Sequence, residues 1–140
     1  IDTRFSPQRI VALDRGNNRI LHLDLDGNIL GTIASNPPRD PKKPAPITSE
    51  TVRNPSSASF HGDLMCVAEI GGRVSVWDKE NKLVAALGVN EKFTNTPGIE
   101  PAAWQQGTVT SPHGITFDNA GNILECEWNK WGRVLRWNKK

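Results

Sequence analysis

One phrase occurs three times in this sequence: an apolar run ending in an acidic residue, a short loop, and an arginine followed by a β-branched residue. The acidic residue and the arginine of each copy are Asp14 and Arg19, Glu69 and Arg73, and Glu127 and Arg133. Apolar and polar residues alternate around each copy, and Gly and Asn, which tolerate positive φ, stand in the loops. The phrase therefore predicts a repeated antiparallel hairpin.

Repeated units made only of strands and turns are typical of β-propeller blades rather than of one closed barrel. We therefore expect an all-β fold of about three blades, each a four-stranded antiparallel sheet, forming a single half-propeller domain over residues 1–140. Its expected parts are a partial blade 1 at 1–34, a loop at 35–54, blade 2 at 55–88, a loop at 89–110 and blade 3 at 111–140. The pattern lacks a first strand in blade 1 and a fourth strand in blade 3.

The charge and hydropathy of the chain argue against two classes of partner. Seventeen basic and fifteen acidic residues give a net charge of +2, and the basic residues are scattered, so no footprint for nucleic acid is present. No apolar run approaches the roughly 18–20 residues that span a bilayer, so no membrane partner is expected. The first residues show no signal peptide and no initiating Met, which indicates a processed or excised piece.

The two cysteines fall in the second strands of blades 2 and 3. Aligning these strands places Cys66 opposite Leu124 and Cys126 opposite Ala68. The alignment predicts that both cysteines point inward and pack in the core as reduced residues, rather than forming a disulfide or a metal site.

Blade 3 carries further motifs: Pro-His-Gly-Ile from Pro112, Phe-Asp-x-x-Gly-Asn-Ile from Phe117, and Gly-Arg-Val from Gly132. These motifs resemble the NHL repeat of six-bladed β-propellers, and the resemblance covers nearly all of the chain outside its two long loops. It implies blades that stack on one another, and it favours an exported, periplasmic or extracellular, location. Three units are half of such a ring, and open sheet edges invite pairing. We therefore expect either the C-terminal half of a longer propeller or a homodimer formed through the open blade edges.

A propeller mouth would gather the polar residues of different blades. Strand directions alternate within a blade, so the loop before the first strand and the loop between the second and third lie on one face. The residues predicted there are Arg15, Ser56, Glu69, His113, Glu127, Trp128 and Trp131. We expect this mouth to bind a peptide or a small molecule. A purely structural reading stays open for several of them, since the repeated arginines can pair with the neighbouring acids and Glu69 and Glu127 can cap their loops.

The positions of the three histidines decide whether a metal site is expected. His22 falls inside a third strand and His61 in a hairpin of the opposite face, so only His113 reaches the mouth and a three-histidine site is not expected. Trp77 and Trp137 occupy equivalent third-strand positions, which indicates packing between blades.

Residues 13–20, Leu-Asp-Arg-Gly-Asn-Asn-Arg-Ile, and the later Pro112-His113 are similar to the last half of the peptidyl-hydroxyglycine amidating lyase domain, a zinc enzyme. The resemblance implies that Arg15 is an active-site residue that binds substrate or stabilises developing negative charge, and that His113 ligates zinc. Gly114 stands where that family has Asp, and the family's other zinc histidines and its catalytic Tyr have no counterpart here. The chain alone is therefore expected to bind rather than to catalyse. The alternative is part of a zinc-dependent lyase or hydrolase, and a metal at the mouth would be zinc or calcium.

Overall fold

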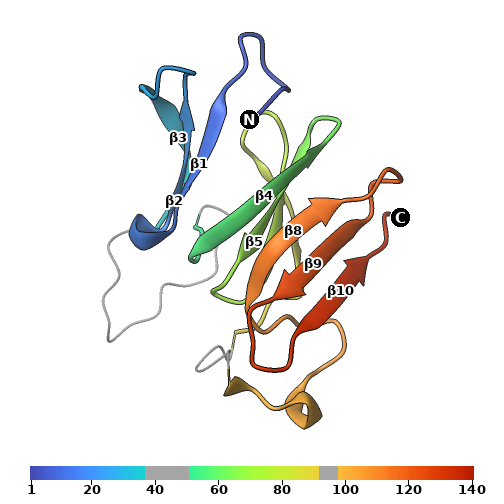
Figure 1. Cartoon of the computed structure of the whole chain (residues 1–140). Coiled ribbons are helices and arrows are strands. Elements are labelled where there is room, and N and C mark those ends of the chain that lie inside the picture. Colours follow the sequence, from blue (N-terminus) through green and yellow to red (C-terminus); the bar gives the residue numbers. More distant parts are fainter. Residues whose placement is uncertain (37–50, 92–97) are drawn as a thin grey trace.

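The computed structural model describes residues 1–36, 51–91 and 98–140, and in these residues the chain forms three antiparallel sheets that stand side by side (Figure 1). Blade 1 contains β1 (Ile10–Asp14), β2 (Arg19–Leu23) and β3 (Ile29–Ser35). Blade 2 contains β4 (Pro55–His61), β5 (Leu64–Glu69), β6 (Arg73–Trp77) and β7 (Leu83–Leu87). Blade 3 contains β8 (Pro112–Phe117), β9 (Ile123–Glu127) and β10 (Arg133–Trp137).

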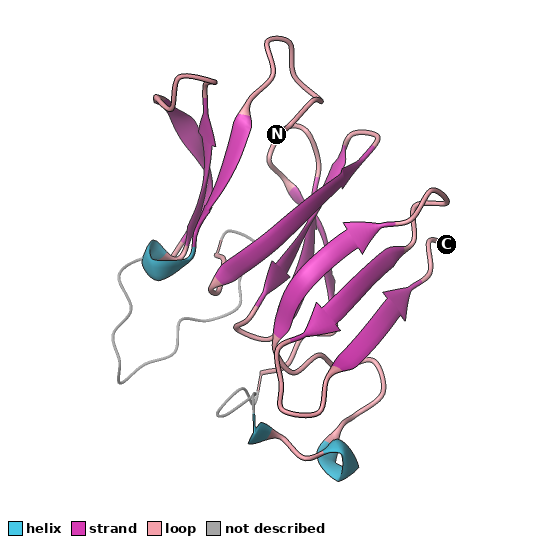
Figure 2. Cartoon of the chain, viewed as in Figure 1, coloured by secondary structure: helices cyan, strands magenta, loops and turns pink. Residues whose placement is uncertain are grey.

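Helical structure in the described part of the chain is confined to short turns (Figure 2). The 3₁₀ turn η1 (Arg15–Asn17) joins β1 to β2, and η3 (Pro101–Ala103) precedes blade 3. Within these described ranges no helix has the length and apolarity that crossing a membrane requires. The expected all-β class with about three blade-like antiparallel sheets is confirmed.

The repeated phrase forms the same hairpin in each blade. Each acidic strand end is the register partner of the following arginine: Asp14 of Arg19, Glu69 of Arg73, and Glu127 of Arg133. The residue before each arginine adopts a left-handed backbone, with φ of 50° at Asn18, 94° at Gly72 and 68° at Gly132. Asn and Gly adopt this conformation at the least cost, which explains why only these two residue types occupy the position.

Two hydrophobic clusters hold the three sheets together. The first joins blade 1 to blade 2 and contains Ile20, Ile33, Met65, Val67 and Trp77. The second joins blade 2 to blade 3, where Cys66, Val74, Val76 and Ile123 are buried and Trp137 packs against them. Successive residues of a strand point to opposite faces, so blade 2 contributes one face to each cluster. The predicted packing role of Trp77 and Trp137 between blades is confirmed.

The prediction for Cys126 was wrong, because this side chain is exposed whereas Cys66 is buried. Alternation along β9 places Cys126 on the face that includes Leu124, Val134 and Arg136, and we call these four residues the exposed face of blade 3. Val134 on this face is 71% exposed. The equivalent residues of blade 2 include Ala68 and Val74, and both are completely buried next to blade 3. Burial at these positions therefore depends on a neighbouring blade rather than on the strand itself.

Candidate binding mouth

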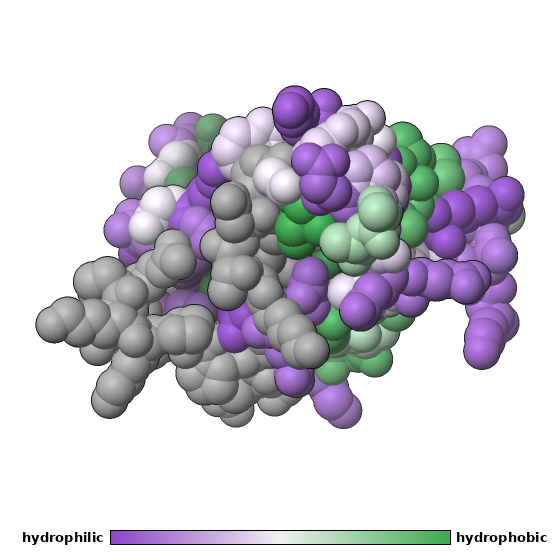
Figure 3. Space-filling model, turned by 90° about the horizontal axis from the view of Figure 1, so that it is seen from below, coloured by the Kyte–Doolittle hydropathy of each residue, from purple (hydrophilic) through white to green (hydrophobic). Residues whose placement is uncertain are grey.

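The turns predicted to form the mouth lie at one end of the sheets. The turn η1, the β5–β6 turn and the β9–β10 loop all lie at the lower end in Figure 1, as do the starts of β4 and β8. Figure 3 views the molecule from this end, where hydrophilic residues occupy much of the described surface and hydrophobic residues gather beside them. The loops that carry the predicted mouth residues therefore lie at the same end of the three sheets, as the alternation of strand direction predicted.

Arg15 is an exposed residue of η1 at this end. The carboxylate of Asp14 next to it is engaged, because it accepts hydrogen bonds from Asn17 Nδ2 at 2.9 Å and from Arg19 Nε at 2.7 Å. These hydrogen bonds, first that of Asn17 and then that of Arg19, hold the pKa of Asp14 below its ordinary value. Arg15 is therefore a solvent-exposed cation, and the neighbouring Asp14 carboxylate is already paired with Arg19.

Glu69 and Glu127 are not presented at the mouth surface. Arg73 lies 2.8 Å from Glu69 with both side chains buried, and Arg133 lies 2.7 Å from Glu127. Burial raises the pKa of Glu69, and the charge and hydrogen bonds of Arg73 act in the opposite direction. Both arginines thus pair with the neighbouring acid, which confirms the structural reading of these two repeats.

The same two pairs hold the segment that precedes their own blade. Backbone N–H groups of Arg53 and Thr110 donate to Glu69 and Glu127, respectively. The arginines donate in turn to backbone carbonyls two residues earlier, at Thr51 and Thr108. We call each such arrangement a loop clasp. The clasp satisfies a buried carboxylate and fixes the start of the first strand of the blade.

The clasps were not predicted from the sequence, although a signal for them was present. Residues 51–55 and 108–112 share the pattern Thr-Val-x-x-Pro before their blades. An asparagine closes the other side of each connecting segment. Asn36 Nδ2 donates to Val52 O at 2.7 Å, and Asn90 Nδ2 donates to Val109 O at 2.8 Å. The repeat therefore extends into segments that the hairpin phrase does not cover.

Ser56 lies at the junction of blades 2 and 3. Its hydroxyl is within hydrogen-bond distance of the carbonyl oxygens of Ala68 at 3.0 Å, Pro112 at 3.2 Å and His113 at 2.9 Å. The hydroxyl therefore links the first strand of blade 2 to that of blade 3. We call this contact the Ser56 brace, and its role is structural.

His113 and Trp128 form an exposed aromatic pair beside this brace. Their ring centroids are 6.3 Å apart at an interplanar angle of 51°, and Trp128 is 53% exposed. Ser111 fixes the backbone of Trp128, since Trp128 N donates to Ser111 O at 2.8 Å and the Ser111 hydroxyl donates to Trp128 O. Trp131 is half-buried three residues further on. The structure thus brings His113, Ser56 and Trp128 together, while Arg15 belongs to blade 1 and Glu69 and Glu127 are enclosed.

A hollow of about 220 Å³ borders the mouth end next to the clasp of blade 3. Trp104 lines it, donates its indole N–H to Ile99 O at 3.2 Å, and lies under the guanidinium of Arg133 with 4.8 Å from carbon to ring centroid. Trp104 is half-buried. This contact ties the segment before blade 3 to the clasp.

The donors for a metal ion do not converge in the described part of the chain, where no group of three or more His, Cys, Asp or Glu side chains could hold an ion. His22 is buried in blade 1, 3.2 Å from Asp2. His61 lies at the opposite end of the sheets, with its ring 5.5 Å from that of Phe117. One imidazole, that of His113, is left for the mouth, so residues 1–36, 51–91 and 98–140 do not fit a complete zinc site within one chain.

Comparison with known proteins identifies the fold. No family model matches the sequence, and no curated protein matches it. Among solved structures, the chain is similar to selenomethionine-substituted virginiamycin B lyase from Staphylococcus aureus, with 14% identity and a TM-score of 0.53. A streptogramin B lyase structure matches with 15% identity and a TM-score of 0.43. Each match covers 94% of this chain, but only 38% of the first structure and 48% of the second. The first match shows a β-propeller fold.

Proposed function

We propose that the chain is an NHL-type β-propeller segment that pairs with a second copy to form a six-bladed ring, and that the ring is a binding module. The single observation that carries this proposal is the exposed face of blade 3. Its counterpart on blade 2 is covered by blade 3, and the counterpart on blade 1, which includes Ile20, is covered by blade 2. The same face of the blade is thus buried by the next blade in blades 1 and 2, and it is exposed in blade 3.

The partner for the exposed face is blade 1 of the second copy. Blade 1 presents Ile29 and Leu30, which are 60% and 54% exposed, on its fourth-strand equivalent β3. Covering these apolar side chains with a second sheet would remove apolar surface from water, which favours association. Two identical contacts between blade 3 of one copy and blade 1 of the other would close a ring of six sheets.

The ligand of the ring would bind at the mouth. His113, Trp128 and Arg15 supply an imidazole, an aromatic surface and a cation, and these groups suit a peptide or a small molecule that carries an aromatic and an anionic group. In a twofold ring the two copies of His113 would face each other across the mouth, as would the two copies of Arg15. Ser56 would act by holding His113 in place.

The test is the mass of the protein in solution, measured by light scattering and sedimentation velocity. We expect a dimer of twice 15.4 kDa, and we expect Val134→Glu to convert it to a folded monomer. Val84→Glu is the matched control, because Val84 is also an exposed valine on a strand, 48% exposed in β7. A monomer at all concentrations would contradict the ring, and so would equal effects of the two substitutions.

The alternative is a zinc-dependent lyase or hydrolase of the amidating-lyase type. What favours it is the position of His113 at the mouth, together with the similarity of the fold to that of a protein named as a lyase. The measurement is the zinc content of the purified protein. Stoichiometric zinc that disappears in His113→Ala supports this assignment, and a folded, zinc-free protein removes it.

A further inference from the structure

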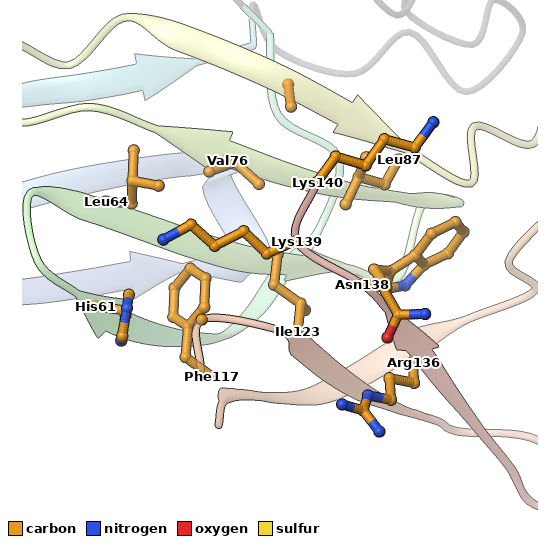
Figure 4. Close-up of a pocket in the computed structure, with 13 residues that line it drawn as sticks. His61, Leu64, Val76, Leu87, Phe117, Ile123, Arg136, Asn138, Lys139 and Lys140 are labelled. Atoms are coloured by element: carbon orange, nitrogen blue, oxygen red, sulfur yellow. The ribbon is translucent and has the colours of Figure 1, made fainter. Parts of the chain in front are cut away.

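A second hollow lies away from the mouth, between the outer strands of blades 2 and 3 (Figure 4). It is a groove of about 600 Å³ with apolar walls. One wall is formed by Val76, Ala85 and Leu87 of β6 and β7, and the other includes Trp137 of β10. This volume is within the range of ordinary ligand-binding sites.

The groove runs beside an open sheet edge. In the described residues β10 pairs with β9 alone, so one side of its backbone lacks a strand partner. The equivalent strand of blade 2, β6, carries the fourth strand β7 on that side, with Val74 opposite Leu87 and Val76 opposite Ala85. Blade 2 therefore shows, within the same chain, what covers this position when a blade has four strands.

A buried hydrogen-bond donor of the groove wall also lacks a partner. The indole N–H of Trp77 donates to the Ser75 hydroxyl at 2.8 Å. At the equivalent position of blade 3, Leu135 replaces that serine, and the indole N–H of Trp137 is buried with no hydrogen-bond partner among the described residues. Leaving such a group unsatisfied is costly, so an oxygen atom of a bound segment would be stabilised there.

The rim of the groove is basic. Arg136, Lys139, Lys140 and His61 line it, and no carboxylate side chain is among its lining residues. Arg136 pairs with Asp118 at 3.6 Å, and the described residues record no salt bridge for Lys139 or Lys140. In Figure 4 the side chain of Lys139 extends across the hollow between Leu64 and Phe117. The rim would attract a negatively charged partner and repel a positively charged one.

From the open edge, the apolar walls and the basic rim, we propose that this groove binds an acidic peptide segment as a fourth strand of blade 3. The segment lies antiparallel along β10, places small and apolar side chains against Val76, Ala85 and Leu87, and directs carboxylates to Lys139 and Lys140. Main-chain hydrogen bonds supply the affinity of such strand addition, and the alternate side chains supply the specificity. The site depends on neither the mouth nor the ring.

The test uses a fluorescein-labelled peptide that keeps the β7 sequence Leu-Val-Ala-Ala-Leu between two pairs of glutamates. We expect saturable binding by fluorescence anisotropy, together with slower hydrogen exchange of the β10 amides. Placing proline at the central alanine removes a strand hydrogen bond, and we expect binding to weaken at least about tenfold. Replacing the glutamates by lysines should weaken it at least about threefold at low salt, since screening limits the effect at higher salt.

Matched protein variants locate the site. Lys139→Glu should weaken binding of the glutamate peptide, whereas Lys130→Glu, at a lysine that is also exposed but lies at the other end of the sheet, should leave it unchanged. Absence of saturable binding overturns the proposal. Equal binding of the proline peptide also overturns it, because the groove then takes apolar groups without strand pairing. If the peptide dissociates a dimer, a second copy occupies the groove and the proposed partner is wrong. A monomeric protein that still binds the peptide contradicts the ring alone.

Discussion

Arg73 and Glu69 form the most enclosed ion pair of the three repeats. The nitrogen and oxygen are 2.8 Å apart, and the two side chains are 1% and 0% exposed. The equivalent Arg19 and Asp14 are 41% and 26% exposed. One sequence phrase thus creates two environments, because the segments before blades 2 and 3 cover their ion pairs through the clasps, and no such clasp is recorded for Asp14 and Arg19 among the described residues.

The difference predicts unequal effects of removing the arginine. Arg73→Met leaves the buried Glu69 carboxylate uncompensated, and we expect a loss of about 3–5 kcal/mol in the free energy of unfolding. Arg19→Met removes a solvent-screened pair, so we expect a much smaller loss. Urea denaturation of both variants under one set of conditions measures the two values. Equal losses would show that the clasp of blade 2 is no more important than its exposed counterpart.

The buried Glu125 should make the free energy of unfolding depend on pH. This residue is 1% exposed, neither of its carboxyl oxygens has a hydrogen-bond partner within the described residues, and Val67 is its equivalent in blade 2. Burial raises the pKa of Glu125 to about 8 from an ordinary value of 4.5, the Glu127 carboxylate adds to the rise, and Arg133 opposes it. Between these two pH values the folded chain holds a proton that the unfolded chain releases. Stability should therefore fall as pH increases from about 4.5 to about 8.

Substitution of Glu125 tests this dependence directly. At pH 8 Glu125→Gln should be more stable than the original chain by up to about 4 kcal/mol, since one pKa unit corresponds to about 1.4 kcal/mol. At pH 4.5 the two proteins should have similar stability. Glu80→Gln, at an exposed position, is the control. Parallel stability curves for the original chain and Glu125→Gln would show that Glu125 does not titrate in this range.

The two cysteines should differ in reactivity. Cys126 is exposed, whereas Cys66 is buried and burial raises the pKa of its thiol to about 12. Because the thiolate is the reactive form, iodoacetamide at pH 8 should modify Cys126 and spare Cys66 in the folded protein. Peptide mass spectrometry at low protein concentration reads the two sites separately, and both should react in urea. If dimers form, protection of Cys126 at high protein concentration is expected.

Asn90 should contribute more to stability than its place in a connecting segment suggests. Asn90→Asp removes the donor to Val109 O and sets a carboxylate near that carbonyl oxygen, so we expect a loss of about 1–3 kcal/mol. Asn119→Asp, in an exposed turn of blade 3, is the matched control. Thermal denaturation at pH 7 compares the variants. Indistinguishable midpoints would show that the Asn90 side chain does not stabilise the fold.

Local patterns predicted the hairpins well because their determinants are adjacent in sequence. The acidic strand ends, the left-handed loop residues and the arginines all lie within a few residues of one another. Burial was harder to predict, since blade 3 covers Ala68, whereas the described residues place no further blade over Cys126. The clasps were missed because backbone groups of Arg53 and Thr110 form them, and backbone groups leave little trace in side-chain patterns.

The roles of the mouth residues divide in a similar way. Strand direction alone placed Arg15 and His113 at one end of the sheets. It did not show that the Ser56 hydroxyl contacts three carbonyl oxygens, or that Glu69 is enclosed by Arg73. These details depend on how closely blade 2 and blade 3 approach, which is a tertiary property.

The asparagine contacts on either side of the connecting segments have a wider consequence. Asn36 binds Val52 O, and Asn90 binds Val109 O, so the two ends of each segment meet at one point. Once its ends are held together, lengthening a segment changes the closure entropy only with the logarithm of its length. The two connections can therefore change in length at small cost to the sheets, provided that Thr51, Trp104 and Thr108 keep their contacts with Arg73 and Arg133. They are the natural places in this chain for new recognition sequences to be acquired or grafted.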